Sequence, residues 1–171
     1  MPDRAPVKVT NLDIYGSAEI PWSRPHNMLA GGPEERDLPD ANFFTVLGTT
    51  RPDGRPHAAP VWYLWTGKAV YFATRTESVK GKNLGDSAWI VAHFGDADDV
   101  LYMDGPVVKV TDTDEQASVD HDYTAKHLDP TTGEHYGIWA VKGNALYRLD
   151  PRRIVTWNDG QARGRTEWRF D

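Results

Sequence analysis

Short runs of apolar and aromatic residues, separated by clusters of turn residues, make up most of the chain from residue 43 onward. Runs of this length, rich in Val, Phe, Tyr and Trp and bounded by Gly, Pro and Asp, are typical of β-strands. The Asp53-Gly54 pair between the first two runs is a strong hairpin signal. We therefore predict strands at residues 43–49, 60–65, 69–74, 88–94, 100–110, 144–149 and 154–157.

Two segments carry helical signals instead. A short helix is predicted over residues 79–85. One longer helix is predicted over residues 112–128, where Thr113 and Gln116 have the spacing of a capping box.

The order of these elements predicts the fold class. Most strands follow one another through tight turns, without the strand–helix–strand alternation and Gly-rich turn of a dinucleotide-binding sheet. The pattern therefore favours a mainly β fold, a small closed antiparallel barrel with one longer helix and short helices. The Asp104-Gly105-Pro106 sequence predicts a bulge that interrupts the strand 100–110.

The first forty residues differ from the rest because they are rich in Pro, Gly and charge. We interpret residues 1–40 as an extended arm that wraps the body or a partner subunit, and residues 41–171 as the barrel domain. The expected apolar anchors of the arm are Ile14, Tyr15 and Trp22, and a short helix is expected near residues 26–30.

Composition narrows the function classes. The 171 residues suit one domain with a substantial core, and 39% of them are hydrophobic. No apolar run approaches the twenty or so residues of a membrane span, and the first residues lack the apolar segment of a secretory signal. The net charge of -6 argues against a nucleic-acid partner, and the lack of cysteine excludes disulfides and thiolate nucleophiles. We expect a cytoplasmic location.

A polar turn after the strand 69–74 predicts an anion site. Ser78, Lys80, Lys82 and Asn83 lie at the start of the short helix, and Thr74 can add a hydroxyl. Free backbone N–H groups and the positive end of the helix dipole attract phosphate at such a position. The alternative is a solvated helix start in which Ser78 is only the N-cap.

Two other segments are suited to a flat ring. Small residues Ala58 and Ala59 stand between His57 and the run Pro60, Val61, Trp62, so a ring can lie against the backbone there. This segment also suits an edge strand whose prolines prevent aggregation. At the C-terminus, Trp168 and Arg169 either cover a ring and meet a phosphate or carboxylate, or simply pin the tail.

No pattern of side chains indicates catalysis by the protein alone. His121, His127 and His135 lack the spacing of a metal site, and no nucleophile elbow or Ser–His–Asp arrangement is present. We therefore predict no metal and assign no catalytic residue. Such a chain suits an enzyme whose cofactor carries the redox chemistry.

The chain resembles the pyridoxamine 5′-phosphate oxidase-like split-barrel family, whose members use FMN or the deazaflavin coenzyme F420. The matching pieces are R-P-D-G-R-P-H-A-A-P-V-W at residues 51–62, Y-F-A-T at 71–74, S-V-K-G-K-N-L at 78–84, V-T-D at 110–112 and W-R-F at 168–170. The K-x-K-N-L spacing looks closer to the deazaflavin branch.

The resemblance implies a six-stranded Greek-key barrel and a homodimer with two cofactor sites at the subunit interface. It implies that the strand 58–62 lies along the cofactor ring. It implies that the segment from Ala73 through Val79 to Lys82 holds the phosphate. It also implies that Trp168 or Arg169 approaches the cofactor from the subunit interface.

The predicted function is that of an oxidoreductase. It would bind FMN or F420 and transfer hydride to or from a small organic substrate. Two alternatives remain open at this point: a non-catalytic flavin- or deazaflavin-binding protein, and a barrel-type interaction module.

Overall fold

The computed structural model describes residues 5–14, 16–30, 44–85, 87–95, 98–128, 132–158 and 164–171. The predictions for Tyr15, for the arm beyond residue 30 and for residue 43 lie outside these ranges. Three α-helices and a short 3-10 helix are described: α1 (Ser23–Ala30), α2 (Val79–Leu84), α3 (Thr113–Lys126) and η1 (Ile138–Ala140).

The strands of the described chain form one antiparallel sheet that closes into a barrel. Its order is β1-β9-β8-β6-β5-β2-β3-β4-β7, and β7 also pairs with β6. The ring β6-β5-β2-β3-β4-β7 is therefore a closed six-stranded barrel, as predicted, and β8, β9 and β1 extend the sheet outward from β6. The strands are β1 (Lys8–Asn11), β2 (Phe44–Thr50), β3 (Pro56–Trp65), β4 (Val70–Arg75), β5 (Ser87–Gly95), β6 (Asp99–Lys109), β7 (Asn144–Leu149), β8 (Arg153–Asn158) and β9 (Arg165–Arg169).

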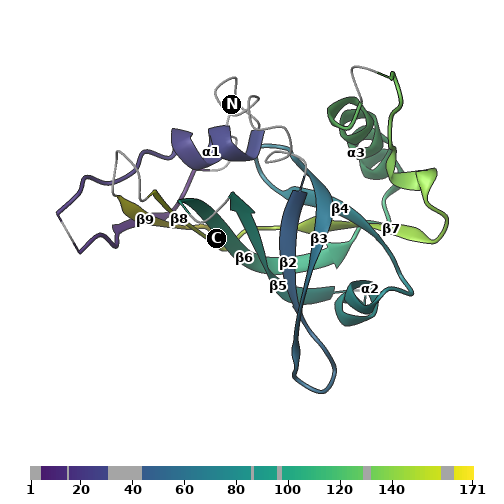
Figure 1. Ribbon diagram of the computed structural model, residues 1–171, viewed down its shortest axis with the longest axis horizontal. Coiled ribbons are helices and arrows are strands. Elements are labelled where there is room, and N and C mark those ends of the chain that lie inside the picture. Colours follow the sequence, from purple (N-terminus) through teal and green to yellow (C-terminus); the bar gives the residue numbers. More distant parts are fainter. Residues whose placement is uncertain are drawn as a thin grey trace.

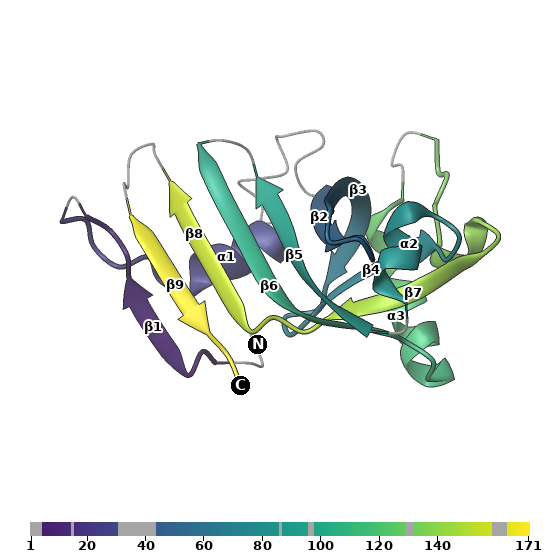
Figure 2. The ribbon, with the colours of Figure 1, turned by 90° about the horizontal axis from the view of Figure 1, so that it is seen from below.

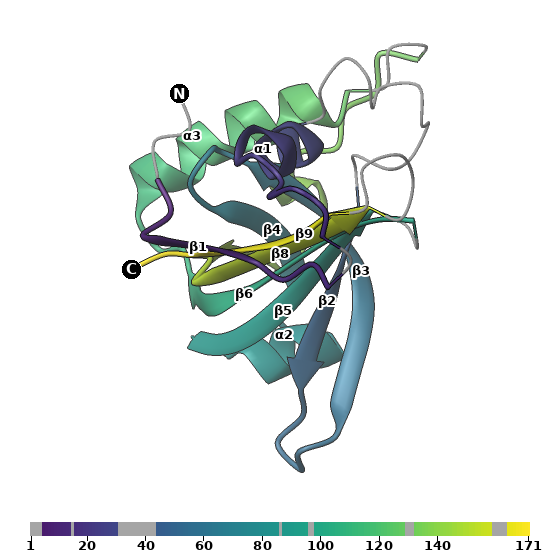
Figure 3. The ribbon, with the colours of Figure 1, turned by 90° about the vertical axis from the view of Figure 1, so that its left-hand side faces the viewer.

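Helices cover the two sides of the sheet unequally. Helices α1 and α3 lie on one side, whereas α2 and the projecting β2–β3 hairpin lie on the other (Figures 1 and 3). Seen from the second side, the strands β1, β9, β8, β6 and β5 run next to one another with α1 behind them (Figure 2).

Strand β6 corrects one prediction, because it continues through the segment expected to bulge. Asp104, Gly105 and Pro106 stay in register with β5. On its other edge β6 changes partner there, from β8 over Asp99–Asp104 to β7 over Val107–Lys109. A Cβ atom at Gly105 would lie 2.2 Å from the carbonyl oxygen of Asp150, so only glycine lets the β7–β8 connection pass.

The terminal segments are more regular than the sequence indicates. Strand β1 and strand β9 pair with each other, although one was expected as an extended arm and the other as a tail. Helix α1 begins at Ser23, three residues before the predicted start. The Trp22 ring packs against Trp168 and Phe170, with ring centroids 5.6 Å and 5.2 Å apart, which buries the tail.

The core has two parts because side chains alternate along each strand. On β3, Val61, Tyr63 and Trp65 belong to the cluster that fills the barrel and continues beneath α1. Leu64 points the other way, into a second cluster between the barrel and α3, and Trp62 packs against that cluster. Helix α3 thus lies on the outside of the barrel wall that carries β3.

Candidate cofactor site

A cavity of about 360 Å³ opens where β3 and β4 diverge. The two strands pair only over Tyr63–Trp65 and Val70–Phe72, so the next residues of each strand separate. The volume of the cavity falls within the roughly 300–1,000 Å³ of small-molecule sites. The lining residues are Pro60, Val61, Trp62, Ala73, Thr74, Arg75, Ser78, Lys80, Tyr123, Tyr136, Gly137, Ile138, Ala140, Val141 and Asn144.

One end of the cavity is polar and cationic. The lining there includes Arg75 and Lys80, the hydroxyl groups of Thr74 and Ser78, and the Asn144 amide. No carboxylate is found among the described lining residues. This set of donors is suited to an anion such as phosphate.

Backbone geometry brings this polar end together. The Ser78 hydroxyl accepts a hydrogen bond from Gly81 N at 3.0 Å and lies 3.2 Å from the Thr74 hydroxyl. It also donates to the Arg75 carbonyl oxygen at 2.8 Å, so it ties the end of β4 to the start of α2. A Cβ atom at Gly81 would lie 2.2 Å from that same carbonyl oxygen, so the turn needs glycine there.

Another part of the cavity wall is aromatic and apolar. Trp62 is half-buried and meets the edge of Tyr136, with ring centroids 5.2 Å apart. Behind it, His127 stacks on the indole at 4.9 Å with an interplanar angle of 15°. Tyr123 lines the cavity and packs on His127 at 4.3 Å. The wall therefore presents flat, rigid surfaces.

Side chains on α3 and β7 form hydrogen bonds with the segment that carries Tyr136, Ile138 and Val141. Asp120 on α3 accepts from the Ile138 backbone N–H at 2.9 Å. The Asn144 side chain donates to the Ile138 carbonyl oxygen at 2.8 Å. The apolar rim of the cavity is thus fixed to both α3 and β7.

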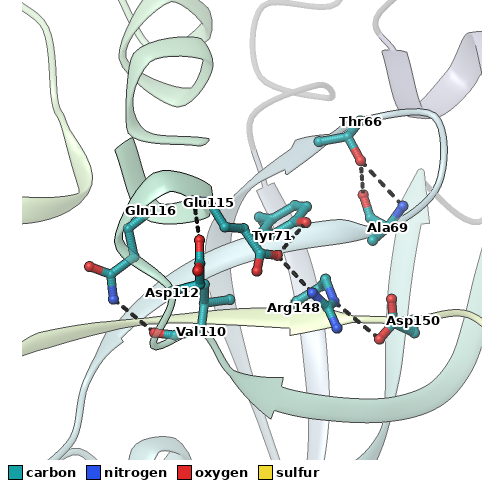
Figure 4. Close-up of polar contacts among 9 residues, drawn as sticks. All are labelled: Thr66, Ala69, Tyr71, Val110, Asp112, Glu115, Gln116, Arg148 and Asp150. Carbon is teal, nitrogen blue, oxygen red and sulfur yellow. Dashed lines mark hydrogen bonds and ion pairs between the residues drawn. The ribbon is translucent and has the colours of Figure 1, made fainter. Parts of the chain in front are cut away.

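Helix α3 is itself attached to the barrel by a polar network (Figure 4). The Glu115 carboxylate accepts from the Tyr71 hydroxyl at 2.8 Å and from Arg148 Nη1 at 2.7 Å. Arg148 Nε donates to Asp150 at 3.2 Å. Burial, together with the bond to Glu115, raises the pKa of Tyr71 to about 12, so the phenol stays protonated as a donor. This network joins the first turn of α3 to β4 and β7.

Buried ionisable groups lie at the other end of α3. Burial lowers the pKa of Lys126 to about 7, and its Nζ lies 3.6 Å from the centroid of the Tyr63 ring. Burial and the neighbouring Lys126 charge lower the pKa of His127 to about 4. Burial raises the pKa of Tyr123. All three residues are therefore held toward their neutral forms.

Most of the chain matches a known protein family. The family model described as pyridoxamine 5′-phosphate oxidase matches residues 32–158. The chain belongs to this family. The match contains every lining residue of the cavity, whereas Trp168 and Arg169 lie beyond it.

Solved structures share the fold. A pyridoxamine 5′-phosphate oxidase-related, FMN-binding protein from Nostoc punctiforme aligns with a TM-score of 0.60 and 19% identity over 86% of this chain and 90% of that one. PhzG from Burkholderia lata, solved with tetrahydrophenazine-1-carboxylic acid, aligns with a TM-score of 0.60 and 16% identity, covering 91% and 95%.

A third structure covers nearly the whole chain. A putative 5-nitroimidazole antibiotic resistance protein from Bacteroides thetaiotaomicron aligns with a TM-score of 0.55 and 15% identity over 96% of this chain and 91% of that one. At these identities the likeness concerns the fold alone. No curated protein matches the sequence.

Seven of the predicted site residues meet in this cavity of the oxidase-family barrel. They are Pro60, Val61, Trp62, Ala73, Thr74, Ser78 and Lys80.

Other predicted residues lie elsewhere in the described chain. His57, Ala58 and Ala59 precede the cavity on β3, where they pair with β2. On α2, Val79 is exposed outside the lining, Lys82 Nζ is 3.6 Å from Glu77, and Asn83 donates to Thr49 at 2.9 Å.

Trp168 and Arg169 are on β9, beyond the barrel. Trp168 is only 1% exposed, and Arg169 is paired with Glu167 at 2.7 Å. Within one chain, neither residue lines the cavity.

Several lining residues were missed by the sequence analysis. Arg75 follows the expected strand 69–74 directly, and its cation next to Thr74 was the available signal. The others come from α3 and from the segment up to β7, and only the folded barrel brings them to β3 and β4. They are Tyr123, Tyr136, Gly137, Ile138, Ala140, Val141 and Asn144.

Among the described residues, no three His, Cys, Asp or Glu side chains are arranged to hold a metal ion. The helices in the described ranges are all too short or too polar to cross a bilayer.

Proposed function

We propose that this protein is an oxidoreductase that binds FMN or coenzyme F420 in the cavity and acts on a small organic substrate. The observation that carries the proposal is the composition of the cavity. One cavity combines a cationic, hydroxyl-rich end, with no carboxylate among its described residues, and an aromatic wall, within a chain of the pyridoxamine 5′-phosphate oxidase family. This combination suits a ligand with a phosphate at one end and a flat ring at the other.

The residues present have separate tasks in this proposal. Arg75 and Lys80 would hold the phosphate, helped by the hydroxyl groups of Thr74 and Ser78. Trp62 and Tyr136 would exclude water from the ring. When bound, either cofactor supplies two-electron hydride chemistry that amino-acid side chains lack. Tyr123, kept protonated by burial, is available as a hydrogen-bond donor at the cavity wall.

We further propose that the protein works as a homodimer, with the cavity beside the subunit interface. Trp89 and Val91 on β5 and Val46 on β2 are exposed apolar residues, and Trp89 is 60% exposed. Gly48, in β2, pairs with Val91, and Val46 pairs with Pro60, which lines the cavity. This apolar face, defined by Val46, Trp89 and Val91, therefore reaches the cavity, and an exposed face of this kind favours association.

The phosphate assignment is tested by comparing two lysines of α2. Lys80→Ala should weaken binding of FMN or F420 by about ten- to a hundred-fold, since a charge-assisted bond contributes about 1.5–3 kcal/mol. Lys82→Ala is the matched control, because Lys82 lies outside the lining and near Glu77, and it should change affinity by less than about two-fold. Titration followed by absorbance or fluorescence gives both affinities.

The outcomes separate the possible functions. If the two substitutions weaken binding equally, the phosphate does not bind at this end of the cavity. Tight binding with the expected difference, but no reduction of any acceptor by the loaded protein, would favour a cofactor-binding protein without catalysis. Failure to bind either cofactor would overturn the proposal.

A further inference from the structure

Trp62 forms the aromatic wall of the cavity, and three rings fix its position. Tyr136 and Phe44 meet the indole edge-on, with interplanar angles of 70° and 65°. His127, by contrast, stacks face to face on the indole, with ring centroids 4.9 Å apart and an interplanar angle of 15°. The orientation of the indole therefore depends on the imidazole behind it.

His127 is held at its edge as well as at its face. It follows the last turn of α3 and is 4% exposed. Its Nε2 lies 3.2 Å from the carbonyl oxygen of Tyr63, the residue after Trp62 on β3. Because a carbonyl oxygen only accepts, Nε2 carries the proton and donates. One side chain thus connects the end of α3 to both the ring and the backbone of the cavity wall.

The surroundings of His127 favour a neutral ring. Burial is the larger cause, and the adjacent Lys126 charge is the second. The described groups in contact with the imidazole include the indole of Trp62, the backbone carbonyl of β3 and the phenol of Tyr123 on the same helix, and Tyr136 lies beyond the indole.

We propose that His127 is a positioning residue for the cofactor site: its neutral ring holds Trp62 in the cavity wall, so that cofactor affinity falls when the ring is protonated. The inference rests on the proposed function and adds a regulation to it. An imidazolium gains little where it is buried beside an ammonium, so it leaves the stack. The indole then loses its support and the wall loosens.

The sign of the pH effect follows from this arrangement. While it stacks on Trp62, His127 has a pKa of about 4, against an ordinary value of 6.5. The arrangement in which His127 stacks on Trp62 is therefore fully favoured above about pH 6.5. It is progressively disfavoured as the pH falls from there to about 4. Cofactor affinity should decline over the same range.

Two substitutions separate stacking from protonation. His127→Phe keeps a flat ring that cannot be protonated, so affinity near neutral pH should stay within about two-fold of the wild type and the His127 part of the acid decline should vanish. His127→Gln removes the ring but can still donate to the Tyr63 carbonyl, and affinity should fall by about two- to twelve-fold, as expected for loss of an aromatic pair.

His121→Phe is the matched control, because His121 lies on the same helix with its side chain 84% exposed. Its pH profile should match that of the wild type. Any titration of the cofactor phosphate is common to all variants and cancels in the comparison. An acid decline in His127→Phe equal to that of the wild type would overturn the proposal, as would unchanged affinity in His127→Gln.

A measurement on the cofactor-free protein distinguishes this inference from the proposed function. A double-mutant cycle of His127→Gln and Trp62→Ala should show a coupling of about two- to twelve-fold in the unfolding equilibrium constant. Coupling in a protein that binds neither cofactor would overturn the proposed function but retain the positioning of Trp62 by His127. If the effects of the two substitutions on unfolding are additive, His127 does not position Trp62.

Discussion

The ammonium group of Lys126 occupies an unusual environment for a lysine. Its Nζ packs over the Tyr63 ring at 3.6 Å and is fully buried, and no described residue forms a hydrogen bond with it. The cation–π contact offsets only part of the lost hydration. Burial therefore lowers the pKa from an ordinary 10.5 to about 7, and the charged form destabilises the native state.

Lys126→Met should therefore stabilise the protein near neutral pH, by about 1–3 kcal/mol. Because the folded-state pKa is lowered, the unfolded chain binds more protons between about pH 7 and 10.5, and wild-type stability rises with pH through that window. Methionine has no proton to lose, so the gain should shrink toward about pH 10. Denaturant unfolding at both pH values measures the difference.

The exposed Lys142 is the control for this prediction. Lys142→Met should leave the pH dependence of unfolding unchanged. A gain from Lys126→Met that is the same at both pH values would show that hydration of the charge is not the cause.

Single residues also show how far the sequence could define the site. Ser78 and Thr74 were predicted because a strand that runs into a capped helix has a local signature. Lys80 and Lys82 were grouped together, but residues two apart on a helix point in different directions, and only Lys80 lines the cavity. The contribution of Tyr136 depends on packing between distant segments, for which no local pattern exists.

The N-cap of α3 lies one residue before the predicted capping box. Asp112 is the N-cap, and its carboxylate accepts from Glu115 N at 2.8 Å. Gln116, expected to complete the box with Thr113, instead donates to the Val110 carbonyl oxygen at 2.8 Å. An acidic residue is preferred at this end of the helix dipole, which explains the choice.

Asp112→Ala should lower the free energy of unfolding by about 0.5–2 kcal/mol, the usual effect of losing an N-cap. Thr113→Ala is the matched control at the next position, where the threonine is exposed and within the first turn, and it should have less effect. Thermal or denaturant unfolding of the two variants decides between the caps. A larger loss of unfolding free energy in Thr113→Ala would show that Thr113 is the N-cap, as the sequence indicated.

The elements that the sequence did not reveal share a physical cause. Among the described strands, β1 pairs with β9 alone, and β9 pairs with β1 and β8. Strand β1 has four residues and little alternation between buried and exposed positions. The continuity of β6 depends on two partners that meet the same edge on either side of Gly105. The strands of the barrel itself were predicted because each carries a buried apolar stripe of its own.

The uneven covering of the sheet bears on how copies of the protein associate. Helices α1 and α3 cover one side, while Val46, Trp89 and Val91 remain exposed in adjoining strands of the barrel. Large apolar groups at the centre of an interface contribute most of its binding energy. A second copy of the chain seated on this apolar face would bury all three residues and border the cavity.

Val91→Glu should therefore disrupt the proposed dimer. A carboxylate in the middle of an apolar interface would be desolvated without a partner, and the dimer dissociation constant should rise by about thirty-fold or more. Sedimentation or light scattering across a concentration series measures the change. Leu128→Glu is the control, since Leu128 is an exposed apolar residue just after α3 and is not part of the apolar face. If Val91→Glu and the wild type have the same mass at every concentration, the apolar face is not the interface. Loss of the dimer together with weaker cofactor binding would link the cavity to the second subunit.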